Sequence, residues 1–291
     1  MSKRKQIKSD TITNGKRAAD AEDSGSDEDF DMLDVEFEWF DPSPDIDFHG
    51  IKSLLQQLFD VDNQSFDLSA LTDLILAQPL LGSTVKVDGI ETDPYAFLSV
   101  INLQVHKDKP FVANLVRYLQ GKANSNPTHN QLSQLLSQPE IPPIGLILTE
   151  RLINVPSEVS PPMYNMLLEE IQWANEEKEP YTFSHYLILS KTYTEVASQL
   201  DQEDDRPRKK KKASGSAAEV LYFHPEDEVF QRHAVSYGPY QYSTPQDDGH
   251  SDSKRAFQEL GIRPQGHMIL LNASKFESAV KEVAQYLAPP S

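Results

Sequence analysis

The chain has 291 residues, with 45 Asp or Glu against 27 Lys or Arg and a formal net charge of −18. Hydrophobic residues make up only 38% of it, so we expect one folded core diluted by polar tails. The absence of Cys excludes disulfides, thiolate zinc sites and a cysteine nucleophile. No apolar run approaches membrane-spanning length and the first residues are charged, so neither membrane insertion nor a secretory signal is expected.

The charge is unevenly distributed along the chain. Two short strings, residues 1–19 and 206–212, hold the basic surplus, so the remainder is more acidic than the net charge suggests. Such a body repels nucleic acid and anionic membrane surfaces, and it attracts basic partners. We therefore predict that the folded part does not bind nucleic acid directly.

Residues 1–29 are predicted to form a disordered tail, basic first and then acidic, because they lack the apolar residues that could offset chain entropy. One α/β domain is expected over residues 30–291. Ser24 and Ser26 each have an acid three positions on, as an acid-directed kinase requires. Ordinary tail serines explain them equally well.

The first half of the predicted domain alternates strands with amphipathic helices. Val35, Phe37 and Trp39 alternate with Glu36 and Glu38, which is typical of a half-buried strand. The patterns that follow predict a helix at 51–59, a helix at 67–77 with Asp67 as N-cap, strands at 84–87 and 97–105, a helix that ends near Gly121, a short helix at 132–136 and a buried strand at 144–148.

The second half continues the alternation. It predicts a helix from Ser160 as cap to 171, a strand at 183–189, a polar charged insert at about 199–218, strands at 220–223 and 268–271, and a terminal helix at 276–287. Roughly seven strands and six helices in this order indicate an α/β fold with a single mixed sheet covered by helices on both faces.

Motifs for nucleotide or acyl chemistry are missing. The 12 Gly form neither GxGxxG nor GxxxxGK[ST], and GxSxG is also absent. Asp60, Asp62 and Gln64 begin like a calcium loop, but Ser65 stands where the loop needs Gly and Leu71 where it needs Glu. We predict no catalytic, cofactor-binding or metal-binding residue.

Polar residues that could suggest a site have simpler explanations. His49 and His224 lack HxH or HxxxH spacing, so we interpret them as turn and strand-end groups. Asp41, Asp45 and Asp47 stand around two prolines and are interpreted as turn residues, with a carboxylate cluster as the alternative.

A basic septet is the sharpest local signal. Six of its seven residues are bases, as a nuclear import signal requires: Arg206, Arg208, Lys209, Lys210, Lys211 and Lys212. A solvated run that balances the preceding acids, or an RNA contact, are the alternatives. The predicted partner of this septet is a nuclear import receptor.

Four segments, residues 35–59, 86–103, 145–171 and 221–230, resemble the BCCIP family, and the likeness covers about residues 33–290. The resemblance implies a nuclear protein that also shuttles to the cytoplasm, acts as a chaperone for a large-subunit ribosomal protein, and is linked to the nuclear export of a phosphatidylinositol phosphate kinase. It also implies a fold similar to the GNAT-type N-acetyltransferases.

That fold raises an enzyme hypothesis, because acetyltransferases hold the coenzyme pyrophosphate on amides of a Q/R-x-x-G-x-G/A turn between a strand and a helix. The nearest candidate is Arg263–His267, followed by Met268 in place of Gly or Ala. Pro264 removes an amide, and the segment precedes a predicted strand. We therefore predict a protein without enzymatic activity and without cofactors.

The favoured hypothesis is an acidic escort that binds a basic large-subunit ribosomal protein, supports biogenesis of the large subunit and takes part in nuclear export. The alternatives are an acyl-CoA-dependent acetyltransferase and a transport adaptor for a phosphatidylinositol phosphate kinase. The candidate partner-binding residues are acids predicted to be exposed: Asp27, Glu28, Asp29, Asp31, Asp201, Glu203, Asp204, Asp205, Glu226, Asp227 and Glu228.

Overall fold

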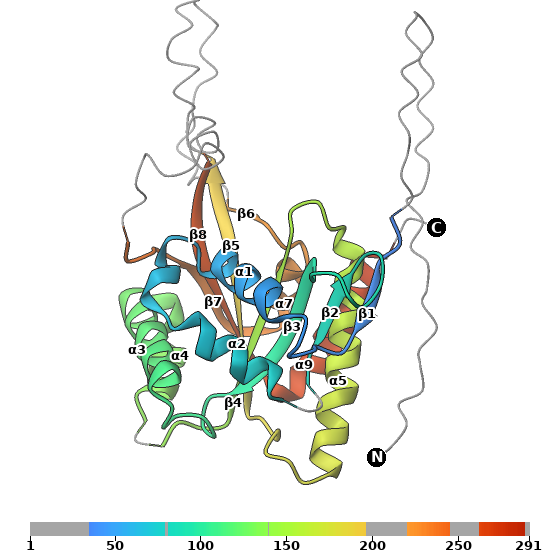
Figure 1. Ribbon diagram of the computed structural model, residues 1–291. Helices are drawn as coiled ribbons and strands as arrows, with labels where there is room; N and C mark the ends of the chain where they lie inside the picture. Colours follow the sequence, from blue (N-terminus) through green and yellow to red (C-terminus); the bar gives the residue numbers. More distant parts are fainter. Residues whose placement is uncertain (1–34, 79–80, 139, 196–219, 245–261, 289–291) are drawn as a thin grey trace, which may run out of the picture.

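A mixed sheet runs through the centre of the molecule in the computed structural model, which describes residues 35–78, 81–138, 140–195, 220–244 and 262–288 (Figure 1). Its strand order is β1-β2-β3-β4-β5-β8-β7, and β6 pairs with the far end of β5. Among the strands of the described ranges, only β4 and β5 pair in parallel. The strands are β1 Glu38–Phe40, β2 Ser83–Lys86, β3 Ala96–Asn102, β4 Ile144–Arg151, β5 His185–Glu195, β6 Val220–Tyr222, β7 Ala234–Tyr240 and β8 Ile262–Asn272.

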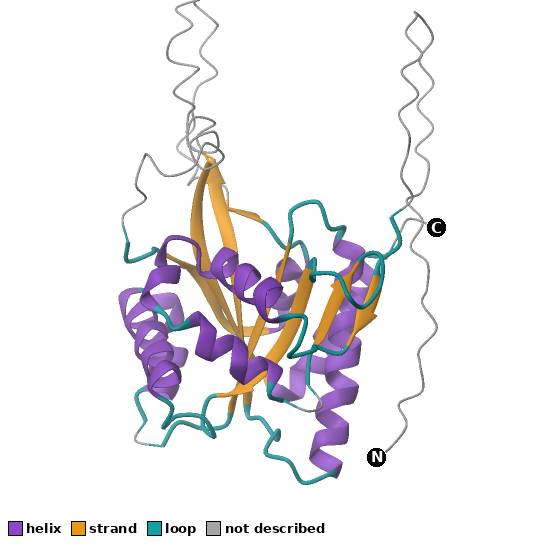
Figure 2. Cartoon of the chain, viewed as in Figure 1, coloured by secondary structure: helices purple, strands orange, loops and turns teal. Residues whose placement is uncertain are grey.

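Helices cover both faces of this sheet (Figure 2). One face carries α1 Phe48–Phe59, α2 Leu68–Leu76, α3 Pro110–Ser125 and α4 Asn130–Leu136. The other carries α5 Ser160–Glu176, α7 Glu226–His233 and α9 Ala273–Tyr286. The predicted α/β class and single mixed sheet are confirmed, and no helix in the described part is long and apolar enough to cross a bilayer.

Adjacent residues of the central strands enter two different cores. Leu146 and Leu148 of β4 pack under α1 to α4, whereas Ile147 packs under α5, α7 and α9. Successive side chains of a strand point to opposite faces, so a strand buried on both sides must be apolar at every position. This is the physical reason why the run at 144–148 predicted the strand correctly.

The predicted start of α2 is confirmed and the predicted end of α3 is not. Asp67 caps α2 as predicted, because its side chain accepts a 3.0 Å hydrogen bond from the amide of Ala70. The predicted end of α3 at Gly121 is wrong, since the helix continues to Ser125. Gly121 is exposed and keeps a negative φ, while Ala123 extends the buried stripe beyond it.

Further elements differ from the prediction: β5 and β8 extend well beyond the predicted strands at 183–189 and 268–271. The first strand begins at Glu38 and not at Val35. Helix α7 was missed because its sequence, EDEVFQRH, is dense in charge, and β7 was missed because it contains Gly238 and Pro239. A β-carbon on Gly238 would lie 2.7 Å from the hydroxyl of Thr128, so glycine lets the neighbouring 3-10 helix (Pro127–His129) approach β7.

Candidate functional site

The parallel pairing of β4 with β5 ends at Leu148 and Leu189, and charged residues follow on both strands. Beyond that point Glu150 of β4 and Lys191 of β5 lie side by side beneath α1. The Lys191 ammonium is 2.6 Å from Oε2 of Glu150, and both side chains are buried. Lys191 also donates to the carbonyl of Gln57 at the end of α1.

His224, in the loop before α7, and Glu226, at the start of α7, belong to the same cluster, as does Arg151 of β4. We call this cluster the buried charge network: Glu150, Arg151, Lys191, His224 and Glu226. Nε2 of His224 lies 3.0 Å from Oε1 of Glu150, and the Arg151 guanidinium holds Glu226 through two bonds of 2.5 and 3.1 Å. These residues join β4, β5, the loop before α7 and α7 itself. The network therefore fixes α7 against the sheet.

The carboxylates of the network are held in their ionised form. Burial alone would raise the pKa of Glu150, but the neighbouring Lys191 and His224 lower it to about 2. Burial likewise opposes the ionisation of Glu226, but the Arg151 guanidinium and His224 together outweigh burial and lower the pKa of Glu226. Each acid thus has a cation that compensates for its loss of water.

Ser160 also belongs to this cluster, in place of the predicted capping role. A short 3-10 helix (Ser157–Val159) precedes α5, and the Ser160 hydroxyl donates a 2.8 Å hydrogen bond to Glu226. The prediction of a Ser160 cap is wrong, because the side chain is used in a long-range contact that sequence spacing could not reveal. The interpretation of His224 as a plain strand-end group missed its contact with Glu150 as well.

Asp227, next to the network, is buried in a different way. Its carboxyl accepts a 2.5 Å hydrogen bond from Ser190. Burial raises its pKa to about 7, and the Glu226 carboxylate acts in the same direction, while His224 opposes them. The pKa of Asp227 is thus shifted in the opposite direction to those of Glu150 and Glu226.

We expect Asp227→Asn to alter the pH dependence of stability. A carboxyl whose pKa is raised in the folded state stabilises the fold at acidic pH, and this contribution disappears as the pH rises through about 7. Between pH 5 and 8 the wild type should lose about 2 kcal/mol of unfolding free energy relative to D227N. Urea unfolding at several pH values checks this, and parallel curves would contradict it.

Two of the candidate partner-binding acids are buried, so the prediction that they contact a partner is wrong. Glu226 and Asp227 are 1% and 2% exposed, so they cannot contact a partner. The first turn of α7 faces the sheet, where Arg151 and Ser190 receive these carboxyl groups. Glu228 is exposed as predicted. The other candidate acids, at 27–31 and 201–205, and the septet Arg206–Lys212 lie outside the described residues, as do the tail 1–29 and the insert 199–218.

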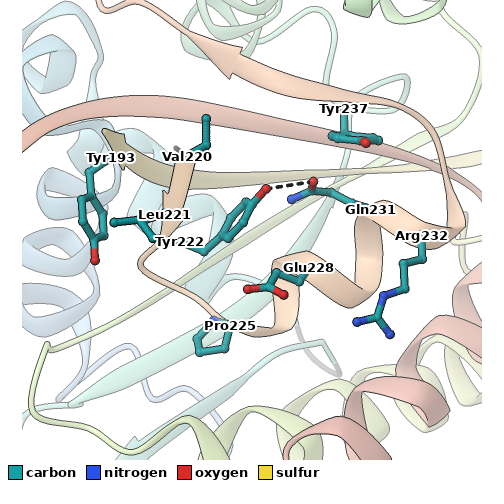
Figure 3. Close-up of a pocket in the computed structure, with 9 residues that line it drawn as sticks. All are labelled: Tyr193, Val220, Leu221, Tyr222, Pro225, Glu228, Gln231, Arg232 and Tyr237. Carbon is teal, nitrogen blue, oxygen red and sulfur yellow. Dashed lines mark hydrogen bonds between the residues drawn. The ribbon is translucent and has the colours of Figure 1, made fainter. Parts of the chain in front are cut away.

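A surface hollow of about 540 Å³ opens beside α7, and we call it the aromatic hollow (Figure 3). Three tyrosines from three strands line it, together with aliphatic residues of β6 and polar side chains of α7. Its lining residues are Tyr193, Val220, Leu221, Tyr222, Pro225, Glu228, Gln231, Arg232 and Tyr237. Nothing in the local sequence predicted the hollow, because its walls come from β5, β6, α7 and β7.

Asp62, which the sequence placed in a loop resembling a calcium site, accepts hydrogen bonds from other parts of the same chain. It is buried and accepts hydrogen bonds from the amides of Ser243 and Thr244, each at 2.7 Å, and from the Tyr118 hydroxyl. Burial opposes ionisation, but these donors lower the pKa of Asp62. Within the described ranges no three His, Cys, Asp or Glu side chains are placed to hold a metal ion.

Asp47, one of the three predicted turn carboxylates, combines two contacts. It accepts a 2.7 Å hydrogen bond from the amide of Ser43, as turn chemistry requires, and it lies 2.6 Å from the ammonium of Lys86. Both charged side chains are fully buried. His49 is exposed on α1.

The segment considered for coenzyme binding, Arg263–His267, is part of strand β8 and not a turn. Its only glycine, Gly266, pairs with Lys191 of β5 and Tyr240 of β7. Gly266 and His267 pair with strands on both sides, while Arg263, Pro264 and Gln265 pair with β5. An extended strand points successive amides in alternating directions and so differs from the turn at a helix N-terminus whose amides converge on a phosphate.

Fold and site together define an acidic, single-domain α/β protein whose sheet interior is locked by buried ion pairs. Comparison with known proteins then places it more narrowly. A family model described as BCCIP matches residues 32–230. The chain belongs to the BCCIP family.

The relatives match most or all of the chain. Protein bcp1 of Aspergillus fumigatus is 65% identical over all of both chains, and protein bcp1 of Schizosaccharomyces pombe is 50% identical over 88% of this chain and 91% of its own. The crystal structure of BCP1 from Saccharomyces cerevisiae is 25% identical and superimposes with a TM-score of 0.60, covering 90% of this chain and 97% of that one. The chain is therefore a homologue of the fungal Bcp1 proteins.

Proposed function

We propose that this protein is a nuclear escort that binds a basic large-subunit ribosomal protein, shields it before assembly and accompanies it in large-subunit biogenesis and nuclear export. The observation that carries the proposal is the acidic surplus together with the way the domain uses its cations. Lys86, Lys122, Arg151 and Lys191 are all paired with acids in the interior. Each of these pairs is electroneutral, so the interior takes up none of the net charge of −18, and these four cations are not available at the surface to offset it.

The surplus is strongest in the first part of the domain. From Glu36 to Asp73 there are nine acidic residues, of which Asp47 and Asp62 are buried, and a single base, Lys52. A free ribosomal protein is rich in Lys and Arg and tends to bind RNA nonspecifically. An acidic surface competes for that charge and speeds association, although individual surface ion pairs are weak and are screened by salt.

Two features support a binding protein over an acyl-CoA-dependent enzyme. The family resemblance implies a fold similar to the GNAT-type acetyltransferases, and these enzymes hold the coenzyme pyrophosphate on a glycine-rich turn between a strand and a helix. Every strand-to-helix junction among the described residues lacks glycine, including 152–159 between β4 and α5. In addition, the buried charge network fills the space where β4 and β5 cease to pair.

The proposal includes nuclear residence with shuttling to the cytoplasm, and it rests here on the septet Arg206–Lys212 as the ligand of an import receptor. A transport adaptor for a phosphatidylinositol phosphate kinase would share this septet but needs no ribosomal client. Nuclear accumulation that persists after deletion of 206–212 would contradict the assigned role of the septet.

Affinity purification of the full-length protein from salt-washed extract, followed by mass spectrometry, tests the escort function. We expect the strongest co-purifying protein to be a basic large-subunit ribosomal protein, and we expect its recovery to fall, but not to vanish, when NaCl is raised moderately. Recovery that does not respond to salt would reject the electrostatic mechanism. Micromolar binding of acetyl-CoA in isothermal titration would favour the enzyme instead.

A further inference from the structure

We propose that the aromatic hollow receives a lysine or arginine side chain of the basic partner. This inference rests on the proposed escort function and names the place on the described surface where a client cation is bound. The volume of about 540 Å³ lies within the range of small-ligand pockets, so a single long side chain with its flanking backbone can enter.

Tyrosine rings give the hollow its affinity for a cation. Tyr222 of β6 and Tyr237 of β7 face the same side of the sheet, and Tyr237 is 46% exposed although it is a large aromatic residue. A ring face attracts Lys or Arg electrostatically and also packs against the aliphatic stem of either side chain. Exposed aromatic residues in a concave site favour a partner over a role in the core.

The charges at the rim favour the same ligand. Glu228 points its carboxylate toward the space beneath Tyr222 (Figure 3), and its Oε2 also accepts a 3.3 Å hydrogen bond from the Tyr286 hydroxyl of α9. The single cation of the lining, Arg232, is directed away from that space toward α9, where it donates a 2.7 Å hydrogen bond to Glu282 and lies 5.4 Å from the Tyr286 ring. The charge of Arg232 is thus balanced by Glu282 outside the hollow, whereas Glu228 is bonded to a neutral hydroxyl, so its negative charge remains at the rim and favours a cation.

The geometry of the hollow is fixed before binding. The Tyr222 hydroxyl donates a 3.2 Å hydrogen bond to Oε1 of Gln231, and Gln231 in turn lies 3.3 Å from His267, which is buried in β8. The buried charge network holds α7, and therefore Glu228, against the sheet. A preformed site binds without the cost of ordering its own side chains.

The test uses full-length protein and fluorescein-labelled octa-lysine, followed by fluorescence anisotropy at moderate salt. Glu228→Gln and Tyr237→Leu each alter an exposed group of the hollow, so the fold is retained. Asp73→Asn on α2, on the opposite face of the sheet, is the matched control because it removes the same charge elsewhere. We expect each hollow variant to weaken binding about two- to fivefold and the double variant about tenfold, with D73N nearly unchanged.

The outcomes separate the hollow from the escort function. If the wild type binds octa-lysine and the hollow variants bind as tightly as D73N, the hollow is rejected and the escort function stands. If the wild type does not bind octa-lysine at all, both are rejected. If deletion of 206–212 tightens binding in the wild type but not in E228Q, the chain's own septet occupies the hollow, and the assignment to a partner side chain is overturned.

Discussion

Replacement of Lys191 by Met is expected to lower the free energy of unfolding by about 3–5 kcal/mol, the usual cost of leaving one member of a buried ion pair without its partner. The Glu150 carboxylate, 1% exposed, would lose the ammonium that now lies 2.6 Å away. Water cannot replace it without opening the packing between α1 and the sheet. Urea unfolding followed by circular dichroism measures the loss.

A second variant separates the missing charge from the change of shape. In Glu150→Gln/Lys191→Met no buried charge is left unpaired at this position, so at least half of the lost stability should return. Lys281→Met, at an exposed pair with Glu277 on α9, should leave stability unchanged. If K191M were as stable as K281M, the network would not be what holds α7 and the sheet together.

Gly266→Ala is expected to destabilise the domain by about 1–3 kcal/mol, because an added methyl group has no room. A β-carbon at this position would lie 2.1 Å from Cζ of Tyr240. The Tyr240 ring is buried and packs against Tyr118 and Tyr242, so it cannot swing aside freely. Thermal and urea unfolding both measure the effect.

A second substitution, at Tyr240, tests whether the ring is the source of the clash. Tyr240→Leu should reduce the additional cost of G266A, so that the double variant loses less stability than the sum of the two single variants. Gly121→Ala is the matched control: nothing lies within 4 Å of its β-carbon, and alanine should stabilise the exposed middle of α3 by up to about 1 kcal/mol. Equal effects of the two alanine substitutions would refute the steric argument.

The sequence predicted the sheet better than the site. Runs such as Ile144–Leu148 identify strands that are buried on both faces, and stripes such as Ile51–Phe59 identify helices, because these patterns follow from local geometry. Charged residues are normally assigned to the surface, and this rule failed at Glu226. Its partner Arg151 is 75 positions away, and no spacing rule relates the two.

The aromatic hollow was unpredictable for a related reason. Tyr193, Tyr222 and Tyr237 belong to separate strands, and two of the elements around them, α7 and β7, were absent from the predicted set. Glu228 alone among the candidate acids near α7 retained the expected exposure. An amphipathic analysis of the octet 226–233, with Val229 and Phe230 both buried, could have indicated that its acids face two different environments.

The place of β8 has a consequence for how the protein is made. Although β8 is the last strand in the chain, it lies between β5 and β7 and pairs with both. Until residues 262–272 leave the ribosome, β5 and β7 each have an unpaired edge, and both cores lack the side chains that β8 contributes. Folding must therefore finish after translation, and a nascent chain cut short before β8 should be a substrate for holding chaperones and proteases.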